Sequence, residues 1–224
     1  MSFIVAIDGP AGTGKGTVTE IISKKFKLLK IDTGATYRCV ALMVIKNNYN
    51  IDDVKKIEEL LPNIDIEFKR ENGEEKVILN GEDVTKEIRS KEVNKIVSQV
   101  SAIIPVRLYM AELQRKMAKG KDVIMEGRDI TTVVLPNADI KIFLTASPEE
   151  RAKRRFKEWE GMEQSAEYAK VLEEIKKRDE MDMTRKESPL LQSEDAVLLD
   201  TTGLSLEQVA DKIGEMIMSY KNKN

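Results

Sequence analysis

One glycine-rich segment near the start of the chain constrains the fold more than any other feature. The run from Phe3 to Ile7 is apolar without interruption, which is typical of a short strand buried on both faces. Apolar residues then return at helical spacing from Val18 to Phe26. The segment between them reads Gly9-Pro10-Ala11-Gly12-Thr13-Gly14-Lys15-Gly16-Thr17. Because a glycine-rich loop between a strand and a helix can wrap phosphate groups with its backbone N–H groups, the sequence predicts an anion site here.

Two side chains of this loop carry the expected chemistry. Lys15 places a positive charge near the β- and γ-phosphates of a nucleotide, and the helix that begins near it adds its positive dipole end. The general pattern has Ser or Thr directly after the lysine, whereas this chain has Gly16, so the hydroxyl that faces the metal has to come from Thr17. The alternative is a glycine-rich turn without a ligand. We expect ATP and Mg²⁺ as the cofactors of this loop.

The remaining pattern predicts an α/β fold. Strand-like runs follow at residues 28–31, 123–125, 140–144 and 196–199, separated by helical stretches. We expect a P-loop NTPase fold, a five-stranded parallel sheet flanked by helices, with the first strand in its centre. Residues 64–84 instead alternate apolar and polar side chains around two Asn-Gly dipeptides, Asn72-Gly73 and Asn80-Gly81. They predict a small antiparallel meander inserted into the domain.

Composition excludes several classes of protein. The 224 residues suit one domain with an insertion, and 37 Lys and Arg against 39 Asp and Glu give no global positive field for nucleic acid or anionic lipid. Cys39 is the single cysteine and histidine is absent, so an internal disulfide and the usual neutral-pH base are excluded. The sequence shows neither a leader nor a membrane span. We expect a cytoplasmic monomer that binds small molecules, without nucleic acid or membrane partners.

Arginines supply the second candidate site. Arg38 and Arg128 each follow a predicted strand, so they could converge on an anion opposite the ATP, or be two ordinary surface arginines. On a helix from about Ser165, the side chains of Arg178, Asp182 and Arg185 share one face, which could bind a polar substrate or be a solvated, salt-bridged surface.

A third group of arginines follows the predicted helix cap at Ser147. Arg151, Arg154 and Arg155 lie within two helical turns of this cap. They could belong to a mobile lid that closes on the γ-phosphoryl group, or to a basic solvated helix.

Taken in order, these motifs resemble the cytidylate kinases of bacteria, within the nucleoside monophosphate kinases. The resemblance runs nearly end to end. The segments that carry it are Asp8-Gly9-Pro10 through Lys15-Gly16-Thr17, Asp32-Thr33-Gly34-Ala35 with Tyr37-Arg38, Gly127-Arg128-Asp129-Ile130, Lys141-Ile142-Phe143-Leu144-Thr145-Ala146, Arg178-Asp179 with Asp182 and Arg185, Pro189-Leu190, and Asp200-Thr201-Thr202. Thr36 and Thr131 depart from the family, which commonly has Met and Gly there, and they bear on local loop geometry.

The resemblance implies a single kinase domain with three excursions from its core. The core would comprise residues 1–36, 111–145 and 186–224, with a monophosphate-binding insertion at 37–110, a lid at 146–160 and a substrate-contacting helix at 163–185.

The resemblance also implies roles for individual residues. Arg38 and Arg128 would hold the acceptor phosphate, Ser98, Arg107 and Asp129 the cytosine edge, and Arg178 and Asp182 the ribose. Asp32, Thr33 and Tyr37 would also contact the acceptor, while Arg151, Arg155 and Arg185 would join Lys15 and Arg128 at the transferring phosphate.

The reaction that follows is transfer of the γ-phosphoryl of ATP to CMP or dCMP. An acceptor phosphate is already an anion and needs no general base, which suits a chain without histidine. Two alternatives stay open: a kinase for another monophosphate such as UMP, and a regulatory or RNA-binding P-loop NTPase.

Overall fold

The computed structural model describes residues 2–71, 73–160 and 168–223, with side chains throughout except at 156–160. The chain forms two compact units. Unit 1 comprises Met1–Lys30 and Ala118–Asn224, and unit 2 comprises Ile31–Met117. The predicted insertion at 37–110 falls within unit 2.

The main sheet contains the five predicted core strands. They are β1 (Ile4–Asp8), β2 (Leu29–Asp32), β6 (Val123–Gly127), β7 (Ile140–Thr145) and β8 (Val197–Asp200). Their order is β2-β6-β1-β7-β8, so the prediction of a central first strand is confirmed. β1 pairs in parallel with β6 from Ile4 opposite Val123 and with β7 from Val5 opposite Ile140. Parallel pairing brings the carboxyl ends of these strands to one edge of the sheet.

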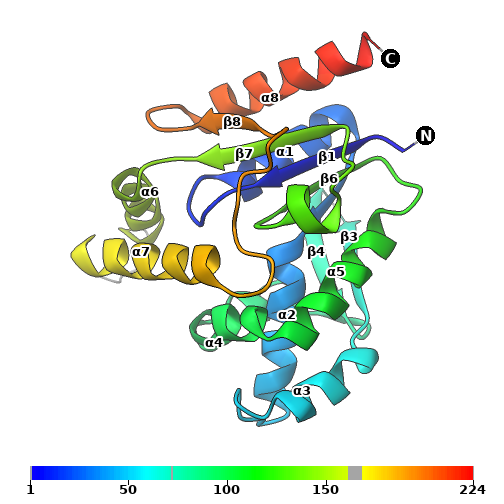
Figure 1. Ribbon diagram of the computed structural model, residues 1–224, viewed down its shortest axis with the longest axis vertical. Helices are drawn as coiled ribbons and strands as arrows, with labels where there is room; N and C mark the ends of the chain where they lie inside the picture. The colour runs from blue at the N-terminus through cyan, green and yellow to red at the C-terminus, as the bar shows by residue number, and fades with distance from the viewer. Residues whose placement is uncertain (1, 72, 161–167, 224) are drawn as a thin grey trace. The chain divides into compact units, whose positions relative to one another are not determined.

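Two helices of unit 1, α1 (Lys15–Phe26) and α8 (Leu206–Lys221), pack against each other and against the strands (Figure 1). Alternate residues of β1, Val5 and Ile7, join the same apolar cluster as Ile22 of α1 and Ile213 of α8. Because alternate strand residues share a face, both helices cover one face of the sheet. α8 begins with a capping box in which Ser205 and Gln208 bond reciprocally, as the sequence predicts.

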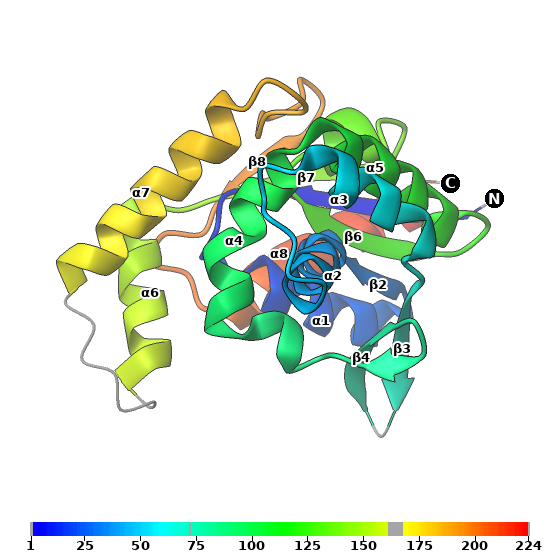
Figure 2. The same ribbon diagram turned by 90° about the horizontal axis from the view of Figure 1, so that it is seen from below.

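Two further helices, α6 (Pro148–Glu160) and α7 (Tyr168–Thr184), lie side by side in both views (Figures 1 and 2). α6 begins where expected, because the Ser147 hydroxyl accepts the N–H of Glu150 at 3.2 Å. The predicted helix 163–185 is seen from Tyr168, since 163–167 lie outside the described residues, and it ends at Thr184, one residue before Arg185. A five-residue π-helical segment, η3 (Ile130–Val134), follows β6.

Unit 2 has its own core around α2 (Thr33–Lys46), which Figure 2 shows end-on. The elements that contribute to this core or border it are α3 (Val54–Leu60), η1 (Leu61–Asn63), β3 (Ile66–Glu71), β4 (Glu74–Leu79), β5 (Glu82–Asp83), η2 (Glu87–Arg89), α4 (Lys91–Ala102) and α5 (Ile104–Ala118). The strands form an antiparallel sheet of order β3-β4-β5, which confirms the predicted meander. Asn80 and Gly81 both have positive φ, 50° and 86°, as a two-residue hairpin turn of this kind requires. The other predicted turn includes Asn72, which lies outside the described residues.

Within the described part of the chain, no single helix is long and apolar enough to cross a membrane. α4 and α5 reach that length only together, across a bend of 93°.

Candidate active site

The backbone of the phosphate loop depends on glycine. Gly12 and Gly14 have φ values of 81° and 86°, which a side chain rarely tolerates. At Gly9 a Cβ atom would lie 2.1 Å from the Leu144 carbonyl oxygen, because the backbone just after β1 lies against the neighbouring strand β7. Gly14 is the N-cap of α1 and has no capping side chain, so the first-turn N–H groups of α1 are left to a ligand or water. The loop therefore has the backbone of an anion site.

Lys15 is buried within this loop, with 6% of the residue exposed. Its ammonium donates to the carbonyl oxygens of Gly9 at 2.7 Å and Pro10 at 2.8 Å. Burial, together with the positive charge of Arg128, holds the pKa of Lys15 well below its usual range, while Glu126 acts in the opposite direction. The charged form of Lys15 is therefore unfavourable without a ligand, and a polyphosphate bound at this loop would stabilise it.

The hydroxyl of Thr17 is exposed on the first turn of α1, where the sequence places it. Nearby lies the buried carboxylate of Glu126, whose Oε1 accepts the Thr19 hydroxyl at 2.8 Å and would be 3.6 Å from a Cβ added at Gly16. No cluster of three or more acidic, Cys or His side chains suited to a metal occurs among the described residues. One hydroxyl and one carboxylate suit Mg²⁺, which takes few protein ligands and binds the substrate phosphates.

Sequence reasoning missed Glu126 and also Asp8. The Asp8 carboxylate is fully buried and accepts the backbone N–H groups of Ile130 at 2.8 Å and Thr131 at 2.7 Å, and the Thr131 hydroxyl at 2.6 Å. Burial raises the pKa of Asp8, and the bonds from Thr131 oppose that rise. An acid at the end of a buried strand is the signal that marks both residues, since apolar strands seldom end on a buried charge without a partner.

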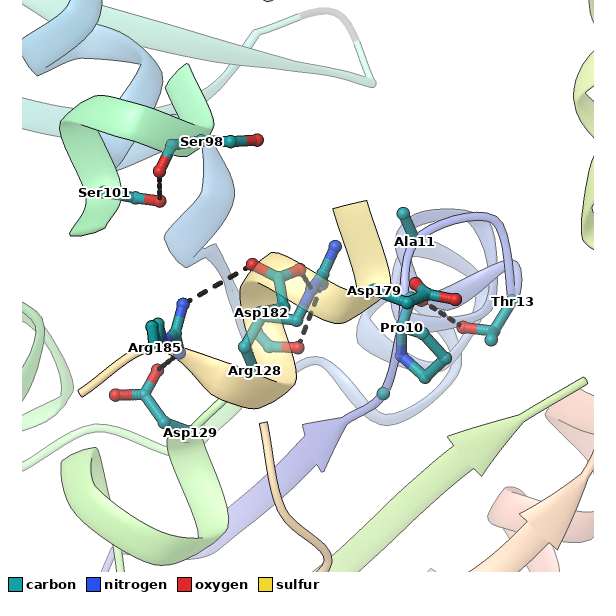
Figure 3. A network of polar contacts seen from close by, with 12 residues as sticks. Pro10, Ala11, Thr13, Ser98, Ser101, Arg128, Asp129, Asp179, Asp182 and Arg185 are labelled. Carbon is teal, nitrogen blue, oxygen red and sulfur yellow. Dashed lines mark hydrogen bonds and ion pairs between the residues drawn. The ribbon is translucent and has the colours of Figure 1, made fainter. Parts of the chain in front are cut away.

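A second cluster joins the segment after β6 to α7 (Figure 3). Arg128 Nε donates to Asp182 Oδ2 at 3.0 Å, and Arg185 lies between Asp182, 3.6 Å from Nη1, and Asp129, 3.8 Å from Nη2. Burial alone would raise the pKa of Asp182, yet Arg128, Arg178 and Arg185 together hold it below its ordinary value. The structure therefore brings together five residues that sequence reasoning drew from two separate motifs, and the solvated-surface alternative does not describe these largely buried side chains.

The arginines of α6 are more buried than those of a basic, solvated helix would be. Arg151 is 3% exposed and bonds to Ala11, Ala146 and Asp179, and Arg154 donates to Thr201 and Glu150. Arg155 is half-buried. The guanidinium groups of Arg151 and Arg154 tie α6 to the phosphate loop and to the ends of β7 and β8. The assignment of these arginines to a lid that closes on the γ-phosphoryl group stays a prediction.

In unit 2, the predicted acceptor residues cluster at the start of α2. Asp32 caps this helix, accepting the Ala35 N–H at 3.1 Å, and Thr33 is its first residue. Arg38 donates to the Ile88 carbonyl at 3.1 Å and to Asn94 Oδ1 at 2.7 Å, so its guanidinium is oriented by two neighbouring segments. The chain thus presents Arg38 in a fixed direction.

The predicted base-reading residues of unit 2 also form a connected group. Arg107 is buried with its guanidinium carbon 5.3 Å from the centre of the Tyr37 ring. Its Nη1 donates to the Ser101 carbonyl at 3.0 Å, and the Ser101 hydroxyl in turn donates to the Ser98 carbonyl at 2.9 Å (Figure 3). The end of α4 therefore orients Arg107, a role for Ser101 that the sequence did not reveal.

The two departures from the family pattern both make buried hydrogen bonds. Thr131 holds Asp8, as described above. The Thr36 hydroxyl donates to the Thr33 carbonyl at 2.8 Å and accepts from Gln114 Nε2 at 2.8 Å, inside unit 2. Each threonine thus anchors a loop or helix start that carries site residues.

Comparison with known proteins identifies the family of this chain. The family model described as "Cytidylate kinase" matches residues 5–219. A cytidylate kinase of Caldicellulosiruptor bescii is 50% identical over 212 residues, 95% of this chain and 94% of that protein. One of Fusobacterium nucleatum subsp. nucleatum is 47% identical over 220 residues, 98% of this chain and 99% of that protein.

Solved structures agree on the fold alone. A shikimate kinase of Bacteroides thetaiotaomicron is 11% identical, with a TM-score of 0.50 over 96% of this chain and 98% of that one. With a phosphate loop at the edge of a five-stranded parallel sheet and a family match over nearly its whole length, the chain is a nucleotide kinase and belongs to the cytidylate kinase family.

Proposed function

We propose that this protein transfers the γ-phosphoryl group of ATP to a phosphate oxygen of CMP or dCMP, giving ADP and CDP or dCDP. The observation that carries the proposal is a group of buried cations in unit 1. Lys15 is buried in the phosphate loop, where burial and the charges of Arg128 and Arg178 lower its pKa. Arg128 and Arg185 both pair with Asp182. A gathering of cations at one sheet edge suits two polyanions that must be brought together.

The donor side uses the phosphate loop. The backbone N–H groups of the loop wrap the phosphates of ATP. The loop residues are Gly9, Pro10, Ala11, Gly12, Thr13, Gly14, Lys15, Gly16 and Thr17, of which Pro10 has no N–H group. The Lys15 ammonium exchanges its loop carbonyl partners for phosphate oxygens. Thr17 and Glu126 are the residues that would hold Mg²⁺, which when bound neutralises charge on the phosphates.

Each unit carries residues that we assign to the acceptor. In unit 1, Arg128 and Arg185 face the phosphate, Arg178 and Asp182 the ribose, and Asp129 the exocyclic amine of cytosine. In unit 2, Arg38 serves the phosphate, Ser98 and Arg107 serve the base, and Asp32, Thr33 and Tyr37 line the start of α2.

No residue has to remove a proton from the acceptor. A phosphate oxygen is already negatively charged, so the barrier is one of placement and of charge repulsion. Lys15, Arg128, Arg155 and Arg185 are the cations we assign to this task. The family resemblance also implies that Arg151 contacts the transferring phosphate, but its bonds to Ala11 and Asp179 support a positioning role.

A coupled ADP-release assay with ATP and Mg²⁺ tests the proposal, with CMP, dCMP, UMP, AMP, GMP and no acceptor in parallel. Fast release with CMP and dCMP alone supports the reaction and the base-reading residues. Release with UMP or another monophosphate would keep the kinase and discard the cytosine site. Release without any acceptor would favour a P-loop NTPase. The monomeric state, the cytoplasmic location and the absence of nucleic acid partners stay predictions.

A further inference from the structure

Arg151 connects three segments of unit 1. Its Nε donates to the Ala146 carbonyl at 3.0 Å, just after β7, and its Nη1 donates to the Ala11 carbonyl of the phosphate loop at 2.9 Å. The third partner is Asp179 of α7, which receives Nη1 at Oδ1 over 3.1 Å and Nη2 at Oδ2 over 2.5 Å. One guanidinium group thus touches the loop, the sheet and α7.

The geometry of this contact is rigid. Arginine binds a carboxylate through two parallel N–H bonds only when the two planes are aligned, and lysine cannot reproduce that fork. Both side chains are largely buried, with 4% of the Arg151 side chain and 13% of the Asp179 side chain exposed. Since a buried ion pair that loses one partner leaves a costly charge, the pair holds its arrangement more firmly than an exposed pair does.

The pair also fixes one particular face of α7. Val171, Ile175, Asp179 and Asp182 recur at helical spacing, and Val171 and Ile175 pack with Ala152 of α6 in one apolar cluster. Asp179 continues this face toward Asp182, which bonds to Arg128. Whatever sets the position of Asp179 therefore also sets the position of the ribose and phosphate residues that follow it.

A second observation links the phosphate loop to α6. Gly12 has a φ of 81°, and a Cβ atom added there would lie 3.1 Å from the Cβ of Arg151. The loop backbone and the first turn of α6 thus lie close together, and the positive φ and this tight contact both disfavour a side chain at position 12. The Ala11 bond is therefore part of a packed contact and not an isolated hydrogen bond.

We propose that Arg151 and Asp179 form a positioning latch, which sets the distance between the phosphate loop and the substrate-binding face of α7. Arg151 is then a positioning residue and not one that contacts the transferring phosphate. The latch rests on the proposed function, because α7 matters for turnover only if Arg178, Asp182 and Arg185 bind the acceptor. It predicts that Asp179, to which the proposed function gives no substrate contact, affects both substrates through Arg151.

The test compares Asp179→Asn with a matched control. Asn has the shape of Asp but lacks its charge, so the variant loosens the latch with little change in volume. The control is Glu149→Gln, because Glu149 and Lys176 form another α6–α7 ion pair, at 3.6 Å, whose side chains are about half exposed and far less buried than the latch. We measure kcat and KM for CMP and for ATP in the wild type and both variants.

The latch predicts that Asp179→Asn lowers kcat/KM for CMP by roughly 10²-fold, as expected when reacting groups are misplaced by about 1 Å. Glu149→Gln should stay within about twofold of the wild type, because exposed pairs contribute little. Arg151→Lys should resemble Asp179→Asn, and Arg151→Ala combined with Asp179→Ala should cost much less than the product of the single effects. Wild-type kinetics in Asp179→Asn, or single effects that multiply, would overturn the latch.

A second readout does not depend on turnover. Amide hydrogen exchange at residues 11–14 reports how firmly the loop is held, and Asp179→Asn should speed that exchange while Glu149→Gln does not. If the wild type fails to phosphorylate CMP, the proposed function fails, and this exchange experiment still tests the latch. If the wild type is active and Asp179→Asn leaves either its kinetics or its loop exchange unchanged, the latch alone is wrong.

Discussion

The carboxylate of Asp8 accepts two hydrogen bonds from Thr131, one from the backbone N–H at 2.7 Å and one from the hydroxyl at 2.6 Å. Asp8 is the last residue of β1 and directly precedes the phosphate loop, while Thr131 lies in the π-helical segment after β6. The pair therefore joins the base of the loop to the segment that carries Arg128 and Asp129. Its hydroxyl bond exists only because this position is threonine and not glycine.

Thr131→Val should destabilise the protein by about 1.5–3 kcal/mol near neutral pH, because a buried carboxylate loses one of its donors. The pKa of Asp8 is already raised by burial, and loss of the hydroxyl raises it further. A protonated Asp8 gains less from the Thr131 hydroxyl than the carboxylate does. The difference in unfolding free energy between the wild type and Thr131→Val should therefore shrink as the pH falls through the folded-state pKa of Asp8. Urea unfolding at several pH values measures this, with Thr131→Ser and Thr132→Val as controls. A difference that grows toward acid pH would contradict it.

Lys15→Met should reduce kcat by about 10³-fold or more, by analogy with other cations that act on a transferring phosphate. The fold should not suffer, because burial holds the pKa of Lys15 low and the charge destabilises the folded state. Below its lowered pKa, Lys15 is charged in the folded protein and reduces the stability of the wild type. This cost decreases as the pH rises through that pKa. At neutral pH the melting temperature of the variant should therefore equal or exceed that of the wild type. ADP release and thermal unfolding check both points. Near-normal activity would remove Lys15 from the phosphate site.

Asp129→Asn should reduce the preference for CMP over UMP roughly 10- to 100-fold, the cost of one mismatched buried hydrogen bond. A carboxylate accepts the exocyclic amine of cytosine, whereas an amide can donate to the corresponding carbonyl of uracil. Asp129 also pairs with Arg185, so both substrates will lose some rate. The ratio of the two kcat/KM values isolates the reading of the base, and an unchanged ratio would show that Asp129 does not read it.

Gly9→Ala should destabilise the protein by at least about 2 kcal/mol. The new Cβ would lie 2.1 Å from the Leu144 carbonyl oxygen of β7, so the backbone of the loop or of the strand would have to shift. Gly16→Ala is the matched change, since the nearest neighbouring atom lies at an ordinary contact distance of 3.6 Å. We expect Gly16→Ala to unfold at nearly the wild-type urea concentration. Equal losses in the two variants would mean that loop flexibility and not this close approach decides the cost.

Local patterns in the sequence predicted the strands, the meander and the helix caps. The meander was predictable because alternation and Asn80-Gly81 act over a few residues, and β3 and β4 pair with their near neighbours. The phosphate loop was predictable for the same reason, since its glycines, Lys15 and the flanking apolar runs are contiguous.

Contacts between distant segments were not predictable in this way. Arg151 reads as one of three arginines on a basic helix, and only the fold shows that its partners are Ala11 and Asp179. Thr36 and Gln114 are separated by most of unit 2 in the chain, yet they share a hydrogen bond in its interior. Spacing within one helix carries no signal of such a pair, because the topology decides which helix lies opposite.

The pairing of β1 has a consequence for the order of events during synthesis. Ile4 pairs with Val123 and Val5 with Ile140, so β1 has neither of its neighbours until unit 2, which lies between β1 and β6 in the chain, has been made. The core of unit 2 draws its residues from between Ala35 and Met117 and needs none of those late strands. We therefore expect the inserted unit to fold before the main sheet, while β1 stays unpaired and vulnerable to aggregation until β6 has been synthesised.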